Sequence, residues 1–309
     1  MFSVIFPGQG SQIVGMAKEF HHNFNYIKDY FFRADEILNK KLSKIILEGP
    51  KYELNQTENT QPAIFLVSYS IFKAIEKEVN FDLKKAKFFA GHSLGEYSAL
   101  CCANSINFEQ TIKLLQARGT AMQNAMPSGE GGMIAVLGIN INELTNLIKS
   151  TGSENTCYIA NDNSNNQIVM SGKNSMLENF GKILDENNIK FIKLPVSAPF
   201  HCPLMSKATE KMRGEIYNVE FKNPDINIVS NVTANEVKNS DDIKKLLIEQ
   251  IEKPVRWRES INNMINKGIN EFIEIGPGKV LSGLVKRIDR NAKVKQINTL
   301  KDMETLTND

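Results

Sequence analysis

The chain has 309 residues, of which 41% are hydrophobic and 23% are charged, and its formal net charge is +2. A chain of this length can bury a substantial core, as one large domain or two smaller ones. The near-neutral charge gives no reason to expect nucleic acid or a membrane as a partner. None of the four cysteines falls in a C-x-x-C pair, so neither a disulfide framework nor a metal site is predicted.

The sequence contains no run of 18 apolar residues, and its first apolar stretch ends at Pro7 and Gly8 without a basic segment before it. These features predict neither a membrane-spanning helix nor a secretory signal. Cysteines without a disulfide pattern fit a reducing compartment. We therefore expect a soluble, cytoplasmic protein that acts as a monomer.

The first half of the chain alternates between short apolar runs and segments with helical periodicity. The predicted order is a strand over 1–6, helices over 26–47 and 61–78, a strand over 86–90 and a helix over 96–103. Thr60 is expected to cap the second of these helices, and Pro62 to lie in its first turn, where proline is favoured. Strands alternating with helices predict a parallel sheet covered on both faces, with ligands at the carboxyl ends of its strands.

Between residues 128 and 196 the pattern changes to β-α-β-β-α-β. The predicted strands cover 133–139, 156–160, 167–171 and 190–194, and the predicted helices cover 141–149 and 175–186. This order is typical of a ferredoxin-like unit. We therefore predict a large α/β domain formed by residues 1–127 and 197–309, interrupted by a small domain over 128–196.

The large domain is expected to resume after the small one. Its predicted elements are a strand near 226–231, a helix near 241–251, a last strand over 271–275 and a closing helix. The Asn- and Lys-rich tail after Ile288 is expected to be a solvated end. A basic cluster at this end of the chain could attract an acidic carrier or phosphates, although a solvated tail is the simpler interpretation. The cluster consists of Lys286, Arg287, Arg290, Lys293 and Lys295.

Ser93 stands in the pentapeptide Gly91-His92-Ser93-Leu94-Gly95, between an apolar run and a predicted helix. This context is typical of a nucleophile elbow, in which a sharp strand-to-helix turn exposes the serine hydroxyl. The free N–H groups at the start of the helix would face an oxygen that becomes charged during acyl transfer. The alternative is a Gly-Ser loop without chemical function.

A serine hydroxyl needs a base within hydrogen-bond reach, and the chain has four histidines. His21 and His22 lie in a polar stretch typical of the surface. His92 adjoins the serine, but neighbouring side chains diverge on a tight turn. His201, held between two proline-containing pairs, is the candidate base, and a buried structural histidine is the alternative.

Six motifs together resemble the malonyl-CoA:acyl carrier protein transacylase family across nearly the whole chain. They are Pro7-Gly8-Gln9-Gly10-Ser11-Gln12, Thr60-Gln61-Pro62-Ala63, Gly91-His92-Ser93-Leu94-Gly95-Glu96, Arg118-Gly119, Pro199-Phe200-His201 and Gly276-Pro277-Gly278. The resemblance implies an α/β-hydrolase-like core with a parallel sheet and an inserted ferredoxin-like subdomain. It also implies transfer of a malonyl group from malonyl-CoA to acyl carrier protein for fatty-acid elongation, without a permanent cofactor or metal.

Carried over by the resemblance, Ser93 would attack the thioester of malonyl-CoA while His201 takes its proton. The main-chain N–H groups of Gln9 and Leu94 would form the oxyanion hole. The backbone carbonyl of Gln250 would orient the histidine, where many hydrolases of this fold use a carboxylate.

The resemblance also assigns substrate contacts. Arg118 would pair with the free carboxylate of malonate, whereas an acetyl group would leave its charge buried and unpaired. Phe200 would crowd out a 2-methyl branch, and Gln61 and Asn161 would line the pocket. Without the resemblance, Arg118 would be interpreted as part of a surface ion pair.

Two other functions remain open at this point. A thioesterase or esterase could use the same elbow, with an acid such as Asp162 or Asp185 completing a triad. A non-catalytic module that only binds the carrier is the third possibility. The loop from Gly10 to Gly15 is not a phosphate loop, because Met16 and Ala17 replace the required Lys and Ser or Thr.

Overall fold

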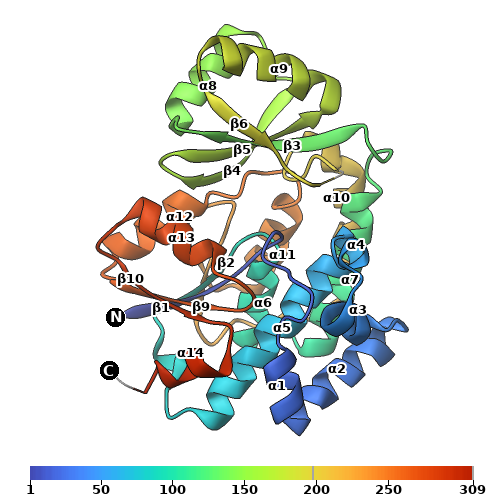
Figure 1. Cartoon of the computed structure of the whole chain (residues 1–309), viewed down its shortest axis with the longest axis vertical. Coiled ribbons are helices and arrows are strands. Elements are labelled where there is room, and N and C mark those ends of the chain that lie inside the picture. Colours follow the sequence, from blue (N-terminus) through green and yellow to red (C-terminus); the bar gives the residue numbers. More distant parts are fainter. Residues whose placement is uncertain (197, 308–309) are drawn as a thin grey trace.

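The structure is a computed structural model that describes residues 1–196 and 198–307. It contains two sheets, one above the other in Figure 1, each covered by helices. The predicted domain boundary at residue 197, and the last two residues of the predicted large domain, lie outside the described residues. No helix among the described residues is long and apolar enough to cross a membrane.

The lower sheet has six strands in the order β10-β9-β1-β2-β7-β8. Their bounds are β1 (Phe2–Phe6), β2 (Phe88–Gly91), β7 (Asn227–Val229), β8 (Glu236–Val237), β9 (Glu271–Ile275) and β10 (Lys293–Ile297). All neighbours are parallel except β7 and β8. The predicted mixed α/β fold with a parallel sheet is therefore confirmed.

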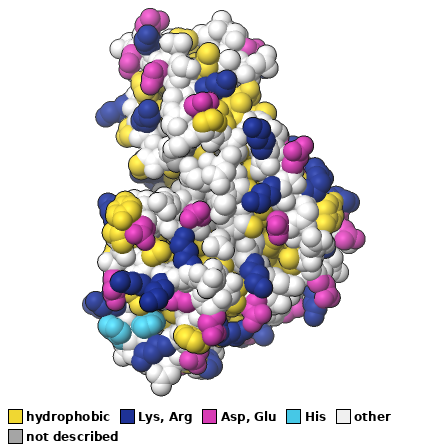
Figure 2. All heavy atoms as spheres, turned by 90° about the vertical axis from the view of Figure 1, so that its right-hand side faces the viewer, with side chains coloured by type: hydrophobic (Ala, Val, Ile, Leu, Met, Phe, Trp, Pro, Cys, Tyr) yellow, Lys and Arg dark blue, Asp and Glu magenta, His cyan; other side chains and the backbone are white. Residues whose placement is uncertain are grey.

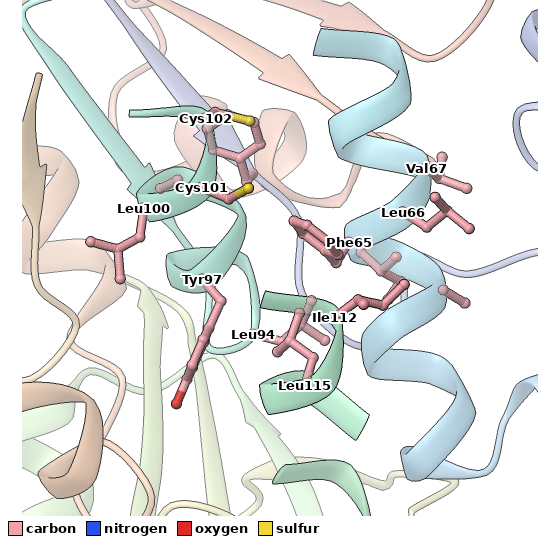
Figure 3. Close-up of a cluster of buried hydrophobic side chains, with 14 of the residues drawn as sticks. Phe65, Leu66, Val67, Leu94, Tyr97, Leu100, Cys101, Cys102, Ile112 and Leu115 are labelled. Atoms are coloured by element: carbon pink, nitrogen blue, oxygen red, sulfur yellow. The ribbon is translucent and has the colours of Figure 1, made fainter. Parts of the chain in front are cut away.

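Helices cover both faces of this sheet. One face carries α5 (Thr57–Glu78), α6 (Gly95–Cys102) and α7 (Phe108–Gln123), and the other carries α12 (Trp257–Asn266) and α13 (Val280–Ile288). Alternation along β1 explains this arrangement, because Val4 and Phe6 pack in the first core and Ile5 in the second. Figure 3 shows the first core, where side chains of α5, α6 and α7 converge.

The upper sheet has four antiparallel strands in the order β4-β5-β3-β6. Along the chain the elements are β3 (Gly131–Leu137), α8 (Ile141–Ser150), β4 (Cys157–Ser164), β5 (Gln167–Lys173), α9 (Asn174–Glu186) and β6 (Lys190–Lys193). Ile134 and Val136 pack beneath α8 and α9, whereas Met133 and Ala135, on the opposite face, join the core of the lower part. The two parts of the molecule therefore share packed apolar surface.

The remaining elements surround the lower sheet. They are α1 (Lys18–Asn23), α2 (Asn25–Leu38), α3 (Leu42–Glu48), α4 (Lys51–Leu54), α10 (Ser206–Tyr217), α11 (Ser240–Glu249), α14 (Leu300–Glu304) and short 3₁₀ turns at Leu83–Lys85 and Pro203–Met205. On the face shown in Figure 2, basic and acidic side chains are interspersed over both parts of the molecule.

The helices differ from the sequence prediction in two places. The helical pattern over 26–47 forms two helices, α2 and α3, separated at Asn39, which adopts a left-handed conformation with φ 46°. The helix expected from Gln61 begins at Thr57, so Pro62 lies in its second turn. Thr60 is therefore not the cap; its hydroxyl donates to the carbonyl oxygens of Leu54 and Gln56.

The prediction of a solvated tail after Ile288 was also wrong. Residues 293–297 form β10, which pairs with β9 at the edge of the lower sheet, and α14 follows. An edge strand has a neighbour on one side only, so it accommodates charged side chains that would be costly in the centre of the sheet. Within the basic cluster, Lys295 lies 3.7 Å from the carboxylate of Glu271.

Candidate active site

A cavity of about 210 Å³ lies between the two parts of the molecule. The lower part supplies the loop after β1, the turn after β2 and side chains of α5, α7 and α13, and the upper part supplies β3, β4 and β5. The predicted site residues that line it are Gln9, Gln61, Ser93, Leu94, Arg118, Asn161, Phe200 and His201. Motifs far apart in the sequence thus meet in one place.

The turn after β2 has the geometry of a nucleophile elbow. Ser93 has a φ of 54°, and α6 begins two residues later. A Cβ on Gly91 would lie 1.9 Å from the carbonyl of Gly95, and one on Gly95 would lie 2.3 Å from the carbonyl oxygen of Phe6. Because these positions have no room for side chains, glycines on both sides make the strained serine conformation possible.

Ser93, His201 and Gln250 form a hydrogen-bonded chain. The Nε2 atom of His201 lies 2.8 Å from Ser93 Oγ, and its Nδ1 atom lies 2.7 Å from the main-chain oxygen of Gln250. A carbonyl oxygen only accepts, so Nδ1 carries the hydrogen and Nε2 is free to accept from the serine hydroxyl. Gln250 itself is fully buried behind the histidine.

The environment of His201 keeps its imidazole neutral. Burial, followed by the positive charge of Arg118, lowers the pKa of His201 to about 3. The hydrogen bond to Gln250 acts in the opposite direction but is outweighed. At neutral pH the unprotonated Nε2 is therefore available to accept the hydrogen bond from the Ser93 hydroxyl.

Arg118 lies on α7, with only 1% of its surface exposed. Its Nη1 donates to Gln61 Oε1 at 2.8 Å, and its Nη2 donates to Gln250 Oε1 at 2.8 Å and to Ser93 Oγ at 3.2 Å. The neighbouring Gly119 explains the close approach of α7 to α5, because a Cβ there would lie 2.5 Å from the carbonyl oxygen of Thr57. A guanidinium thus reaches the serine hydroxyl, and because Arg118 is buried it does not belong to a surface ion pair, the alternative interpretation.

Two main-chain N–H groups at the cavity, those of Gln9 and Leu94, make no hydrogen bond to any described residue. Gln9 follows the carboxyl end of β1, and Leu94 immediately precedes α6. Unpaired N–H groups at a helix start are suited to bind a developing negative charge. The side chain of Gln9 is turned toward Thr57, 3.5 Å away.

The upper sheet provides the opposite wall of the cavity. Asn161 and Asn163 of β4 line it, and Asn163 Oδ1 lies 2.8 Å from Nε2 of His92. The His92 ring also lies near Trp257, with ring centroids 5.6 Å apart. His92 is therefore held between the two parts of the molecule, as expected for a structural rather than a basic role.

The acids considered for a hydrolase triad do not reach His201. Asp162 is paired with Arg258 at 2.8 Å, and Asp185 is exposed on α9. The partner of His201 Nδ1 is the carbonyl of Gln250. Among residues 1–196 and 198–307, no group of three or more His, Cys, Asp or Glu side chains could hold a metal ion.

Asn231 and Glu96 also belong to the site, although no role was predicted for either residue from the sequence. Asn231 Oδ1 accepts from the Ser93 N–H at 2.7 Å, and its Nδ2 donates to the Gly91 carbonyl at 2.7 Å. Glu96 accepts from Gln250. Two features of the sequence could have indicated these residues. Asn231 lies just beyond β7, at the end of a parallel strand, and Glu96 is an acid in an otherwise apolar helix.

A serine on an elbow, hydrogen-bonded to a buried histidine and with an arginine beside it, defines an acyl-transfer site on an α/β fold. The chain matches the acyl transferase domain family over residues 3–305. It is 42% identical over 305 residues to the malonyl CoA-acyl carrier protein transacylase of Bacillus subtilis strain 168, covering 98% of this chain and 94% of that protein. The chain belongs to the acyl transferase family and, within it, to the malonyl CoA-acyl carrier protein transacylases.

Solved structures agree with this assignment. An acyl-carrier-protein-S-malonyltransferase from Bartonella henselae superposes with a TM-score of 0.94 at 38% identity, covering 98% of this chain and 97% of that one. A chain from a complex of a type II PKS acyl-carrier protein with its malonyl-transacylase gives a TM-score of 0.94 at 34% identity, covering 99% and 98%.

Proposed function

We propose that the chain transfers a malonyl group from malonyl-CoA to the phosphopantetheine thiol of an acyl carrier protein, through a malonyl ester of Ser93. The observation that carries the proposal is the hydrogen-bonded chain Ser93–His201–Gln250 with the Arg118 guanidinium 3.2 Å from the serine oxygen. The names of the relatives supply the donor and the acceptor.

In the first half-reaction, Ser93 Oγ attacks the thioester carbon while its proton passes to Nε2 of His201. The tetrahedral intermediate collapses, the C–S bond breaks, and His201 returns the proton to the CoA thiolate. The acyl group stays on the enzyme as a serine ester. The His201 ring, charged during this step, remains oriented by the Gln250 carbonyl.

The second half-reaction runs in the opposite sense. The carrier thiol gives its proton to His201 and attacks the ester carbon, and the serine oxygen leaves with the proton from Nε2. In both steps the N–H groups of Gln9 and Leu94 bind the oxyanion, and loss of one such donor typically costs about 10²–10³ in rate.

In this proposal, Arg118 explains why the acyl group is malonyl, which carries a free carboxylate. Its planar guanidinium can bind a carboxylate through two parallel hydrogen bonds, replacing its present bonds to the Gln61 and Gln250 side chains. Phe200 restricts the space beside the acyl group, and Asn161 and Gln61 line the pocket. No resident metal or cofactor takes part in the proposed reaction.

We propose that residues 1–127 and 197–309 form an α/β-hydrolase-like core and that residues 128–196 form a ferredoxin-like subdomain. The antiparallel order β4-β5-β3-β6, with α8 and α9 on one face, supports the second assignment. We also propose that the protein acts as a cytoplasmic monomer, in keeping with its four free, buried cysteines.

A discharge experiment separates transfer from hydrolysis. The protein is incubated with malonyl-CoA, freed from excess substrate and weighed intact, with and without carrier protein bearing the phosphopantetheine thiol. We expect a malonyl adduct that persists in buffer and disappears, with malonyl-carrier formed, when the thiol is added. Rapid release of free malonate without the carrier would support a thioesterase, and absence of any adduct would support a carrier-binding module.

A further inference from the structure

Glu96 is a buried acid in the first turn of α6, directly beneath the elbow. The residue is 2% exposed, and its Oε2 accepts from Nε2 of Gln250 at 2.7 Å and from the main-chain N–H of Asn231 at 3.1 Å. Glu96 forms no salt bridge with a described residue. Burial raises the pKa of the Glu96 carboxyl to about 7, so this acid occupies an unfavourable position.

The hydrogen-bond partner of Glu96 is Gln250, whose carbonyl orients His201. Besides Glu96, three groups among the described residues contact the Gln250 amide. Arg118 Nη2 donates to Oε1 at 2.8 Å, and Nε2 donates to the Ser93 carbonyl at 3.1 Å and, at a longer 3.3 Å, to Asn231 Oδ1. The main-chain oxygen of Gln250 accepts from His201 Nδ1. Because side chain and carbonyl belong to one residue just after α11, fixing the amide also fixes the direction of the carbonyl.

We propose that Glu96 is a positioning residue of the transfer reaction, which acts by anchoring the Gln250 amide and so holds the carbonyl that selects the Nδ1–H tautomer of His201. The inference rests on the proposed function, because it assigns Glu96 a part in the same site. Glu96 touches neither substrate nor the reacting atoms. Its effect is transmitted through Gln250, and the hydrogen bonds rather than the negative charge carry it.

The test compares Glu96→Ala with Glu96→Gln. Glutamine keeps an oxygen that can accept from both Gln250 and Asn231, whereas alanine removes it. We expect Glu96→Ala to lower kcat by about 10²-fold, the effect of a small misplacement of a catalytic group, with little change in KM for malonyl-CoA. Glu96→Gln should stay within a few-fold of the unaltered protein.

A matched control removes another carboxylate that accepts two hydrogen bonds but lies outside the site. Asp35 on α2 accepts from the Ser43 N–H at 2.8 Å and from the Ser43 hydroxyl at 2.5 Å. Asp35→Ala should lower the thermal midpoint while leaving kcat unchanged, which separates a loss of stability from a loss of positioning.

Nuclear magnetic resonance of ¹⁵N-histidine provides a readout that does not depend on activity. His201 signals, assigned by their absence in His201→Ala, should report the Nδ1–H tautomer in the unaltered protein and in Glu96→Gln, and a mixture of tautomers in Glu96→Ala. This result would hold even if the transfer reaction were not found, so failure of the inference is distinguishable from failure of the proposed function.

A second variant, Gln250→Ala, tests the inference even if Glu96→Ala does not fold. It removes the side-chain amide that Glu96 contacts and leaves the main-chain carbonyl in place. It should reproduce the loss of kcat and the mixed tautomer, and where the double variant folds it should lose no more than either single variant. An unchanged tautomer and kcat in Gln250→Ala, or a Glu96→Gln variant as impaired as Glu96→Ala, would overturn the inference.

Discussion

The Arg118 guanidinium is buried, so water cannot solvate its charge when no carboxylate is bound. Replacing Arg118 with alanine removes a charge-assisted pair worth about 1.5–3 kcal/mol, or about one to two decades in rate. We therefore expect Arg118→Ala to lower kcat/KM for malonyl-CoA by that amount and to raise the relative rate with acetyl-CoA. Both thioesters are assayed side by side, with Arg118→Lys as the control that keeps the charge but loses the planar fork. An unchanged malonyl-to-acetyl ratio would contradict the carboxylate pairing.

The pH dependence follows from His201, whose pKa burial and the Arg118 charge lower to about 3. The neutral ring stabilises the fold above its unfolded pKa of about 6.5, and this stability is lost as the pH falls from there toward the folded value. We expect kcat/KM to show no inflection near pH 6.5 and to remain level down to about pH 5. The Glu96→Gln variant, which lacks the second group titrating nearby, should give the same profile. An acidic limb centred near pH 6.5 that is retained in Glu96→Gln would mean that His201 titrates as an exposed imidazole.

At the scale of elements, the junction of β2 and α6 depends on glycines that have no room for a methyl group. Gly91→Ala would place a Cβ 1.9 Å from the Gly95 carbonyl, so the turn must open. We expect a loss of at least about 3 kcal/mol in the free energy of unfolding, measured by urea denaturation.

Gly214 is the matched control for this prediction. It lies within α10, and an added Cβ would meet nothing within 4 Å. Alanine there should stabilise the protein by about 0.5–1 kcal/mol, because glycine is the poorer helix former. If Gly91→Ala were as stable as the unaltered chain, steric exclusion would not explain the elbow.

Local signals predicted Ser93 and offered His201 as its base, because glycines bracket the serine and prolines flank the histidine, and the short β-α-β-β-α-β elements have clear periodicity. The roles of Arg118 and Gln250 followed only from the family resemblance, because no local pattern marks them. The contribution of Asn231 could not be predicted in the same way, because it meets Ser93 only when β7 pairs beside β2. The strand β10 was missed because its lysines resemble those of a solvated tail until a neighbouring strand is present.

For the whole molecule, the site depends on the contact between its two parts. β4 pairs with the segment around Val255, whose N–H donates to the Ala160 carbonyl at 2.8 Å and whose own carbonyl accepts from the Asp162 N–H at 2.9 Å. Beside this bridge, the buried Asp162 carboxylate pairs with Arg258 of α12. These bonds hold the wall that carries Asn161 against the part that carries Ser93.

Arg258→Ala should weaken this contact, because it leaves Asp162 buried without its partner. Burial already raises the pKa of Asp162, and Arg258 opposes that rise. We expect a loss of about 3 kcal/mol in urea denaturation, much of it recovered when Asp162→Asn is added. Lys245→Ala, which breaks an exposed pair with Asp242, should cost less than about 1 kcal/mol. If Arg258→Ala and Lys245→Ala lowered the free energy of unfolding equally, the Asp162–Arg258 pair would not stabilise the contact between the two parts of the molecule.

In the proposed reaction, Ser93 carries the malonyl group between two thiols. Peptide mapping of the protein, trapped by acid after brief exposure to malonyl-CoA, tests this role directly. We expect a malonyl group on the peptide containing Ser93, and no adduct in a folded Ser93→Ala variant. A malonyl group on another residue, such as the buried Cys101 or Cys102, or an undiminished adduct in Ser93→Ala, would contradict it.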